Sequence, residues 1–223
     1  AAIRTVEGLA DQDGNRHPVQ TAMINADASQ CGFCTPGFVM SLYAAWQNGN
    51  GLAPDDIDNT LAGNLCRCTG YRSIVAAAAT LDRAKNSDMG NPDMEHDGAM
   101  LAALKNMPDG SADLCFGDQS CQFLAPATRA SFAEAYAKNS AATIVSGATD
   151  IGLWVTKQHR KLGCMIWTGG VAGFGQIDDY GDMLRINPAV THQQLLQRTA
   201  DDAPEIAELL RRFGALQVRS SGT

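Results

Sequence analysis

The sequence predicts an α+β fold of two units, a small four-helix domain followed by a domain of mixed helices and strands. Apolar residues recur at helical spacing through residues 17–85, and short apolar runs alternate with capped helical segments through residues 122–223. Residues 86–121 between them are polar and rich in turn-forming residues, with little periodicity, which is typical of a linker. A chain of 223 residues is long enough for two small domains.

The first domain is expected to hold four short helices. Pro18, Pro36 and Pro54 mark three of the starts, because the first turn of a helix does not use the N–H that proline lacks. His17 is interpreted as a helix-start residue rather than a metal ligand. Four helices of this length can form a small bundle. They are expected at residues 18–27, 35–49, 54–63 and 73–85.

The second domain is expected to alternate strands and helices. Ser131 with Glu134, and Thr191 with Gln194, have the spacing of a capping box and so predict helix starts. The turn residues at 179–182 predict a hairpin. Strands are expected at residues 142–146, 164–168, 175–178 and 183–188, and helices at residues 131–139, 151–159 and 204–213.

Composition and charge exclude several classes of protein. The net charge is −7, from 17 Lys and Arg against 24 Asp and Glu, and no basic stripe interleaved with aromatics is present, so nucleic acid is not an expected partner. No apolar run approaches the roughly 18 residues of a membrane span, so no membrane association is expected. Seven cysteines without an export signal indicate a reducing compartment and hence a cytoplasmic location.

Four of the cysteines form two close pairs, Cys31-x2-Cys34 and Cys66-x-Cys68, each just before an expected helix start. The free N–H groups and positive dipole end of a helix start favour an anionic cluster. Four thiolates are what a 2Fe-2S cluster requires, and they also suit a structural zinc ion, for which Cys-x-Cys is the less typical half-site. The spacing favours iron-sulfur and leaves zinc open. No role is assigned to Cys115, Cys121 and Cys164.

The segments around these cysteines, residues 30–41 and 61–72, resemble the molybdenum hydroxylases, most closely their bacterial xanthine dehydrogenase branch. Residues 5–8 and 17–20 are similar to the join between that family's ferredoxin-like domain and its helical cluster domain. The resemblance implies a 2Fe-2S cluster rather than zinc. It also implies that residues 1–16 are the tail of a ferredoxin-like domain and that the chain is cut at both ends.

The resemblance continues in the second domain, where residues 143–157 and 204–223 are similar to segments of the family's FAD domain. In the family, the loop matching residues 144–151 wraps the FAD pyrophosphate, which small residues before a helix start make physically reasonable. Phe213 matches a residue that packs against the flavin, and Thr223 matches the first residue of a further FAD segment. Within residues 122–223, expected to be an incomplete PCMH-type domain, the expected FAD contacts are Ile144, Val145, Ser146, Gly147, Ala148, Thr149, Asp150, Ile151, Phe213 and Thr223.

The resemblance also implies partners outside this chain. Gln30 matches a residue that contacts molybdopterin, and Cys68 matches the cluster ligand nearest the pterin, so both are expected to face a molybdopterin-binding large subunit. Electrons would pass from the molybdenum centre through the cluster to FAD and then to NAD+, with a purine as the expected substrate. The alternatives are a related enzyme that oxidises aldehydes or N-heterocycles, and a non-catalytic zinc module. No general acid or base is assigned, because the cofactors carry the electron chemistry.

Overall fold

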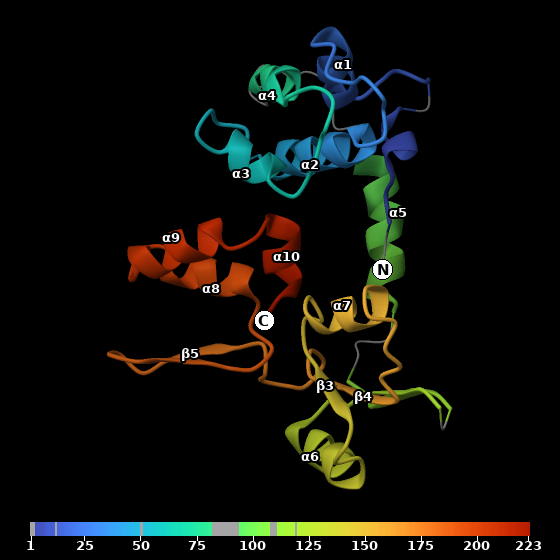
Figure 1. The fold of residues 1–223 in the computed structure, drawn as a ribbon, viewed down its shortest axis with the longest axis vertical. Helices are drawn as coiled ribbons and strands as arrows, with labels where there is room; N and C mark the ends of the chain where they lie inside the picture. Colours follow the sequence, from blue (N-terminus) through green and yellow to red (C-terminus); the bar gives the residue numbers. More distant parts are fainter. Residues whose placement is uncertain (1–2, 12, 50, 82–93, 108–110, 119) are drawn as a thin grey trace. The chain divides into compact units, whose positions relative to one another are not determined.

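The computed structural model describes residues 3–11, 13–49, 51–81, 94–107, 111–118 and 120–223. The chain divides into two compact units, Ala1–Met107 and Pro108–Thr223. The first is helical, and the second combines a four-stranded sheet, a two-stranded hairpin and helices (Figure 1). Within the described ranges, no helix is both long and apolar enough to cross a membrane.

The first two long helices of the first unit begin where the sequence provides start signals. Pro18 and Pro36 lie in the first turns of two helices, as expected. His17 caps the first of them: its Nδ1 accepts the N–H of Val19 (3.2 Å), and the side chain of Gln20 accepts the N–H of His17 (3.0 Å). The elements are the 3-10 helix η1 (Val6–Leu9), α1 (Pro18–Asn25), α2 (Thr35–Asn48), α3 (Ile57–Leu61), α4 (Arg72–Ala79) and α5 (Met94–Lys105).

Two expected helix boundaries in this unit were wrong. α3 begins three residues after Pro54, because the residues between form a hydrogen-bonded turn. α4 ends at Ala79, where the hydroxyl of Thr80 donates to the carbonyl of Ala77 (2.7 Å) and competes with further helical bonding. The last part of the expected helix, residues 82–85, lies outside the described residues.

α2 is the central helix of the first unit's core. It packs against α1 and α3, and α1 packs in turn against α4. Phe38 and Leu42 of α2 are fully buried, together with Val19 of α1 and Ile74 of α4. Burial of each such side chain stabilises the fold by about 1.5–3 kcal/mol. This core holds in place the two loops that precede α2 and α4, which carry the cysteines of the predicted cluster site.

The segment expected to be a linker with little periodicity, residues 86–121, contains regular structure where it is described. It includes α5 and the strand β1 (Leu114–Gly117), which pairs antiparallel with β2 (Gln122–Ala125). β1 has only four residues, too few for a periodic signal, and its pairing is set by the partner strand. Residues 86–93, 108–110 and 119 of the expected linker lie outside the described residues.

The second unit is built on a sheet with strand order β1-β2-β4-β3, in which β2, β4 (Cys164–Trp167) and β3 (Thr143–Val145) are parallel. The helices α6 (Arg129–Lys138) and α7 (Ile151–Thr156) lie in the connections between these strands. Ile166 in β4 is fully buried. The carboxyl ends of β3 and β4 therefore meet at one edge, the place where ligands bind in parallel sheets.

The chain then forms the antiparallel hairpin of β5 (Ile177–Asp179) and β6 (Leu184–Ile186), followed by helices α8 (His192–Thr199), α9 (Pro204–Arg212) and α10 (Leu216–Ser221). The expected hairpin is confirmed, as is the helix that begins at the proline of α9.

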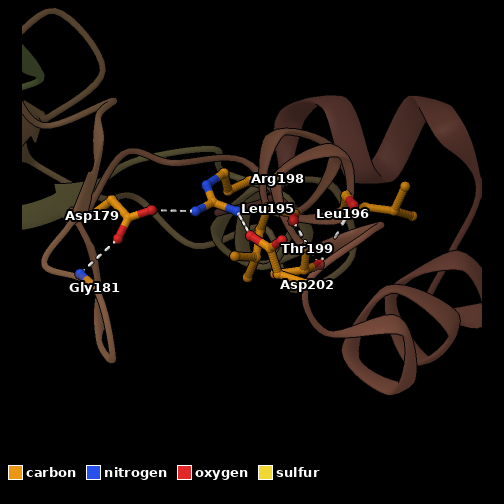
Figure 2. A network of polar contacts seen from close by, with 7 residues as sticks. All are labelled: Asp179, Gly181, Leu195, Leu196, Arg198, Thr199 and Asp202. Carbon is orange, nitrogen blue, oxygen red and sulfur yellow. Dashed lines mark hydrogen bonds and ion pairs between the residues drawn. The ribbon is translucent and has the colours of Figure 1, made fainter.

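An ion-pair network connects the hairpin to α8 (Figure 2). The Nη2 atom of Arg198 lies 2.5 Å from Oδ2 of Asp179, and its Nη1 donates to Asp202. Asp179 also accepts the N–H of Gly181 in the hairpin turn (2.8 Å). Because these charged side chains are partly or largely exposed, the network orients the hairpin more than it adds stability.

One expected capping box is confirmed and the other was wrong. Thr191 caps α8 with Gln194 in the reciprocal position. α6 is capped by Thr128, and Ser131 is the third residue of the helix rather than its cap. Thr128 has the extended backbone that a cap requires, and Glu134 forms an ion pair one turn further along α6 instead.

Candidate functional site

Two loops bring the four predicted cluster cysteines together. In space they form two pairs, each with one cysteine from each loop. Cys31 and Cys34 lie before α2, and Cys66 and Cys68 lie between α3 and α4. The sulfur atoms of Cys31 and Cys68 are 3.5 Å apart, and the thiols of Cys34 and Cys66 lie close enough for each to shift the pKa of the other. In the described part of the chain, no three His, Cys, Asp or Glu side chains gather closely enough to hold one metal ion. Two pairs fit a two-iron cluster, in which each iron takes two thiolates, better than a single zinc ion.

The two pairs differ in their exposure to solvent. Cys66 is 6% exposed and Cys34 is half-buried, whereas Cys31 and Cys68 are exposed. Cys34 directly precedes α2, where free N–H groups and the helix dipole favour negative charge. Gln30, the predicted molybdopterin contact, is also exposed. The site therefore has one side shielded by the core and one side open.

Hydrogen bonds around Cys66 stabilise its thiolate, the form that binds iron. The hydroxyl oxygen of Thr69 lies 3.1 Å from the Cys66 sulfur, and the Thr69 N–H donates to the same sulfur (3.5 Å). These bonds, the hydroxyl first, lower the pKa of Cys66 to about 7. Burial instead raises the pKa of Cys34. Thr69 was not predicted as part of the site, although its place on a tight turn three residues after a ligand is a usable signal.

Asn64 connects the second cysteine loop to α2. Its side-chain amide donates to the hydroxyl of Ser41 in α2 (2.7 Å), and its carbonyl oxygen lies against Gly37, where a Cβ atom would be 2.8 Å away. Gly37 therefore leaves room for the Asn64 side chain where the loop approaches the helix. The contact fixes the two cysteine loops relative to each other, which four ligands of one cluster require.

A cavity of about 500 Å³ lies at the carboxyl ends of β3 and β4. Three of the predicted FAD contacts, Ser146, Gly147 and Thr223, line it. The indole N–H of Trp167 donates to the carbonyl of Ser146 (3.2 Å), and the hydroxyl of Ser146 donates to the carbonyl of Pro188 (3.2 Å), so hydrogen bonds hold this wall. The other residues of the lining are Gly169, Gly175, Ala189, Thr191, Gln193, Gln194, Ser220 and Ser221.

The other predicted FAD contacts lie outside the lining of this cavity. Val145 is buried in β3, and its neighbour Ile144 is 44% exposed. Residues 148–151 lead into α7, which has six residues and ends three residues earlier than expected. Phe213 is 53% exposed and packs against the ring of His192, with ring centroids 5.1 Å apart. Their contact with FAD stays a prediction.

Gly147 packs against the end of α10. A Cβ atom at this position would overlap the carbonyl oxygen of Ser221 and lie 3.0 Å from the Cα of Gly222. Any side chain would therefore push the end of α10 out of the cavity wall. This main-chain approach explains the glycine without any reference to phosphate binding.

Arg219 of α10 does not line the cavity but holds one of the residues that do. It is buried and donates to the side-chain carbonyl of Gln193 (3.1 Å) and to the backbone carbonyls of Arg211 (3.0 Å) and Gly214 (2.6 Å). Burial lowers the pKa of Arg219, and the charge of Arg211 adds to this effect. Since Gln193 lines the cavity, Arg219 fixes one of its polar groups. Neither residue was predicted from the sequence.

Two family models match the chain, one in each unit. Residues 5–79 match a 2Fe-2S binding domain. Residues 119–223 match the FAD binding domain in molybdopterin dehydrogenase. The first match includes the four paired cysteines, and the second includes the whole lining of the cavity.

Relatives of this chain include two groups of enzymes. The xanthine dehydrogenase of Drosophila subobscura is 27% identical over 98% of this chain, which spans 20% of that protein's length. Aldehyde oxidase 1 of Rattus norvegicus is 40% identical over 53% of this chain and 8% of its own length. Among solved structures, quinoline 2-oxidoreductase from Pseudomonas putida 86 is 32% identical, with 40% of this chain and 55% of that chain covered and a TM-score of 0.36.

The fold, the thiol pairs and the two matched models define a chain that joins a 2Fe-2S-binding domain to a FAD-binding domain. Both domain types occur together here, and the relatives are xanthine dehydrogenases and aldehyde oxidases. Each unit thus matches one domain family, and the chain as a whole is similar to enzymes of the molybdenum hydroxylase family.

Proposed function

We propose that this chain is the electron-transfer portion of a xanthine dehydrogenase-like molybdenum hydroxylase. It would connect a molybdenum centre on another chain or region to FAD and NAD+. The observation that carries the proposal is the meeting of two thiol pairs from separate loops, with the sulfur atoms of Cys31 and Cys68 3.5 Å apart. When bound, a 2Fe-2S cluster supplies a one-electron centre, and FAD supplies the link to NAD+.

The four cysteines would hold the cluster as thiolates. Cys31 with Cys68, and Cys34 with Cys66, would each take one iron, since these are the pairs in contact. The buried side, at Cys66, excludes water and supplies hydrogen bonds to sulfur. The open side, with Gln30, Cys31 and Cys68, would face the molybdopterin-binding large subunit.

The second unit would hold part of FAD in the cavity at the carboxyl ends of β3 and β4. Its volume of about 500 Å³ lies within the range of small-molecule sites. Ser146, Thr223 and Gln193 supply polar groups, and Gly147 lets α10 close the wall. The remaining residues at 144–151 and Phe213 would contact parts of the dinucleotide outside the cavity.

The oxidised substrate would be a purine, the electron acceptor NAD+, and the location cytoplasmic. Support comes from the xanthine dehydrogenase relative, which matches 98% of the chain. An aldehyde- or N-heterocycle-oxidising enzyme is the second candidate, because aldehyde oxidase 1 is more identical over the part that it matches. In the complex with the molybdopterin-binding part, anaerobic bleaching of the cluster by xanthine, but not by an aldehyde or quinoline, would favour the first.

The cluster itself is tested by metal and sulfide analysis of anaerobically purified protein, together with its visible absorption spectrum. Two iron and two sulfide per chain, the content of one 2Fe-2S cluster, are expected. Zinc without sulfide would overturn the proposal and leave a structural zinc module. The same sample, titrated with FAD, tests whether this chain binds the flavin.

A further inference from the structure

Thr69 directs two donors at one sulfur atom of the candidate cluster site. Its hydroxyl oxygen is 3.1 Å and its backbone nitrogen 3.5 Å from the sulfur of Cys66. Thr69 is half-buried and Cys66 is buried, so water competes little for these bonds. Thr69 therefore makes its hydrogen bonds to sulfur in the most shielded part of the site.

The direction of the hydroxyl bond follows from the chemistry of the iron-bound sulfur, and the second partner of the hydroxyl is compatible with it. The backbone N–H of Tyr71 donates to the hydroxyl oxygen of Thr69 (3.2 Å), so that oxygen already accepts one bond. A sulfur bound to iron has no proton and can only accept. The hydroxyl hydrogen of Thr69 must then point to Cys66. The result is a chain of donors from Tyr71 through Thr69 to the sulfur, in which each bond strengthens the next.

Tyr71 contacts both residues of this hydrogen bond, Thr69 through its backbone and Cys66 through its side chain. Its phenolic oxygen accepts the backbone N–H of Cys66 (2.9 Å), and its ring packs edge-on against the fully buried Phe38, with centroids 6.1 Å apart. Its φ of 67° lies in the left-handed region, which a tyrosine rarely adopts, and follows Gly70 at φ 65°. Such a conformation persists only where the surroundings impose it.

We propose that Thr69 is a positioning residue that sets the reduction potential of the 2Fe-2S cluster, by donating its hydroxyl hydrogen to the sulfur of Cys66. The inference rests on the proposed function. Reduction adds one negative charge to the cluster, and a hydrogen bond to sulfur stabilises that charge more in the reduced state. Thr69 therefore raises the potential, and Tyr71 keeps the donor in place.

The test is a potentiometric titration of the 223-residue chain with its cluster, followed by visible absorption and by electron paramagnetic resonance. Thr69→Val keeps the shape and removes the donor. The equilibrium constant for reduction is expected to fall about tenfold, which lowers the midpoint potential by about 59 mV for a one-electron couple. Thr69→Ser, which keeps the hydroxyl, is expected to have the wild-type potential. Thr69→Ala is expected to lower the potential as Thr69→Val does.

Thr35→Val is the matched control. Thr35 also lies beside a cluster cysteine, but its hydroxyl is 2.6 Å from that of Ser29, so the variant should leave the potential near that of the wild type. Thr69→Val and Thr69→Ala with the wild-type potential and full iron content would overturn the inference and leave the proposed function intact. Wild-type protein without iron and sulfide would overturn both. If Thr69→Val prevents cluster assembly, the difference in potential between Thr69→Ala and Thr69→Ser decides whether the hydroxyl sets the potential.

Discussion

Cys66 is the ligand position at which burial and hydrogen bonding coincide. The residue is 6% exposed, its sulfur accepts the Thr69 donors, and its own N–H donates to the phenolic oxygen of Tyr71. Cys31, by contrast, lies at the surface. Loss of the Cys66 sulfur leaves buried donors without their acceptor as well as an iron without its ligand, so this position is expected to tolerate substitution poorly.

Cys66→Ser is expected to abolish the cluster spectrum or change it strongly, because serine replaces a soft thiolate with a harder oxygen. Iron and sulfide analysis with the visible spectrum measures this. Cys115→Ser, Cys121→Ser and Cys164→Ser are the controls, since these cysteines lie in the other unit, and their iron content should equal that of the wild type. An unchanged spectrum in Cys66→Ser, or iron lost from a control, would show that the ligand set is wrong.

For the flavin, Thr223 is a cleaner position than Gly147, where valine would displace α10 whatever it did to FAD. Thr223→Val keeps the side-chain shape and removes the hydroxyl of a residue that lines the cavity. Loss of one hydrogen bond of about 1 kcal/mol predicts FAD binding weaker by roughly fivefold, measured by quenching of flavin fluorescence. Thr156→Val is the control, because its hydroxyl bonds within α7 to Gly152 (2.9 Å). Equal loss in both variants would refute a specific role for Thr223.

At the scale of elements, the relative position of the two cysteine loops depends on how closely the loop after α3 approaches α2. The Asn64 side chain bridges them by its bond to Ser41 and its packing on Gly37. The cluster site is thus an arrangement of two loops on one helix, and the helix end and the loop must keep their spacing for the thiols to meet.

Gly37→Ala is expected to destabilise the first unit by about 1–3 kcal/mol, because the new methyl group overpacks against Asn64, which its bond to Ser41 holds in place. Thermal unfolding and iron retention measure the effect. Gly98→Ala in α5 is the matched control: nothing lies within 4 Å of its Cβ position, so helix propensity should stabilise it by up to about 1 kcal/mol. A Gly37→Ala variant as stable as the wild type would show that Asn64 moves freely.

The elements also show how far the sequence alone reaches. Pro18, Pro36 and the Thr191 capping box predicted helix starts, because these signals act within one turn of the chain, whereas Pro54 precedes a turn and not a helix. β1 and its register were missed because a four-residue strand is defined by its partner. The cysteine pairs could be predicted from their spacing in the sequence. The left-handed backbone conformation of Tyr71 could not, because it is imposed by packing that no local pattern reveals.

At the scale of the whole molecule, the cluster cysteines and the cavity belong to separate compact units. The first unit has its own apolar core, around Phe38 and Leu42, and the second has a sheet with Ile166 fully buried at its centre. Each candidate cofactor site is therefore built from residues of one unit, and each unit carries the packing that supports its own candidate site.

Separate expression tests this division. Residues 1–107 are expected to retain two iron and two sulfide, and residues 108–223 to contain neither and to account for the FAD binding of the whole chain. A third piece, residues 122–223, follows the predicted domain boundary and lacks β1, so it should unfold at a lower temperature than 108–223 because the edge of β2 is left unpaired. Equal melting temperatures would favour the predicted boundary.

The unequal exposure of the two thiol pairs has a consequence for handling the metal-free chain. Cys31 and Cys68 are at the surface with their sulfur atoms 3.5 Å apart, so air can oxidise them to a disulfide, with two protons and two electrons passing to oxygen. That bond would remove two of the four ligands and block reconstitution, while Cys34 and Cys66 stay shielded by the core. A thiol reductant should therefore restore the capacity to take up iron and sulfide after exposure to air.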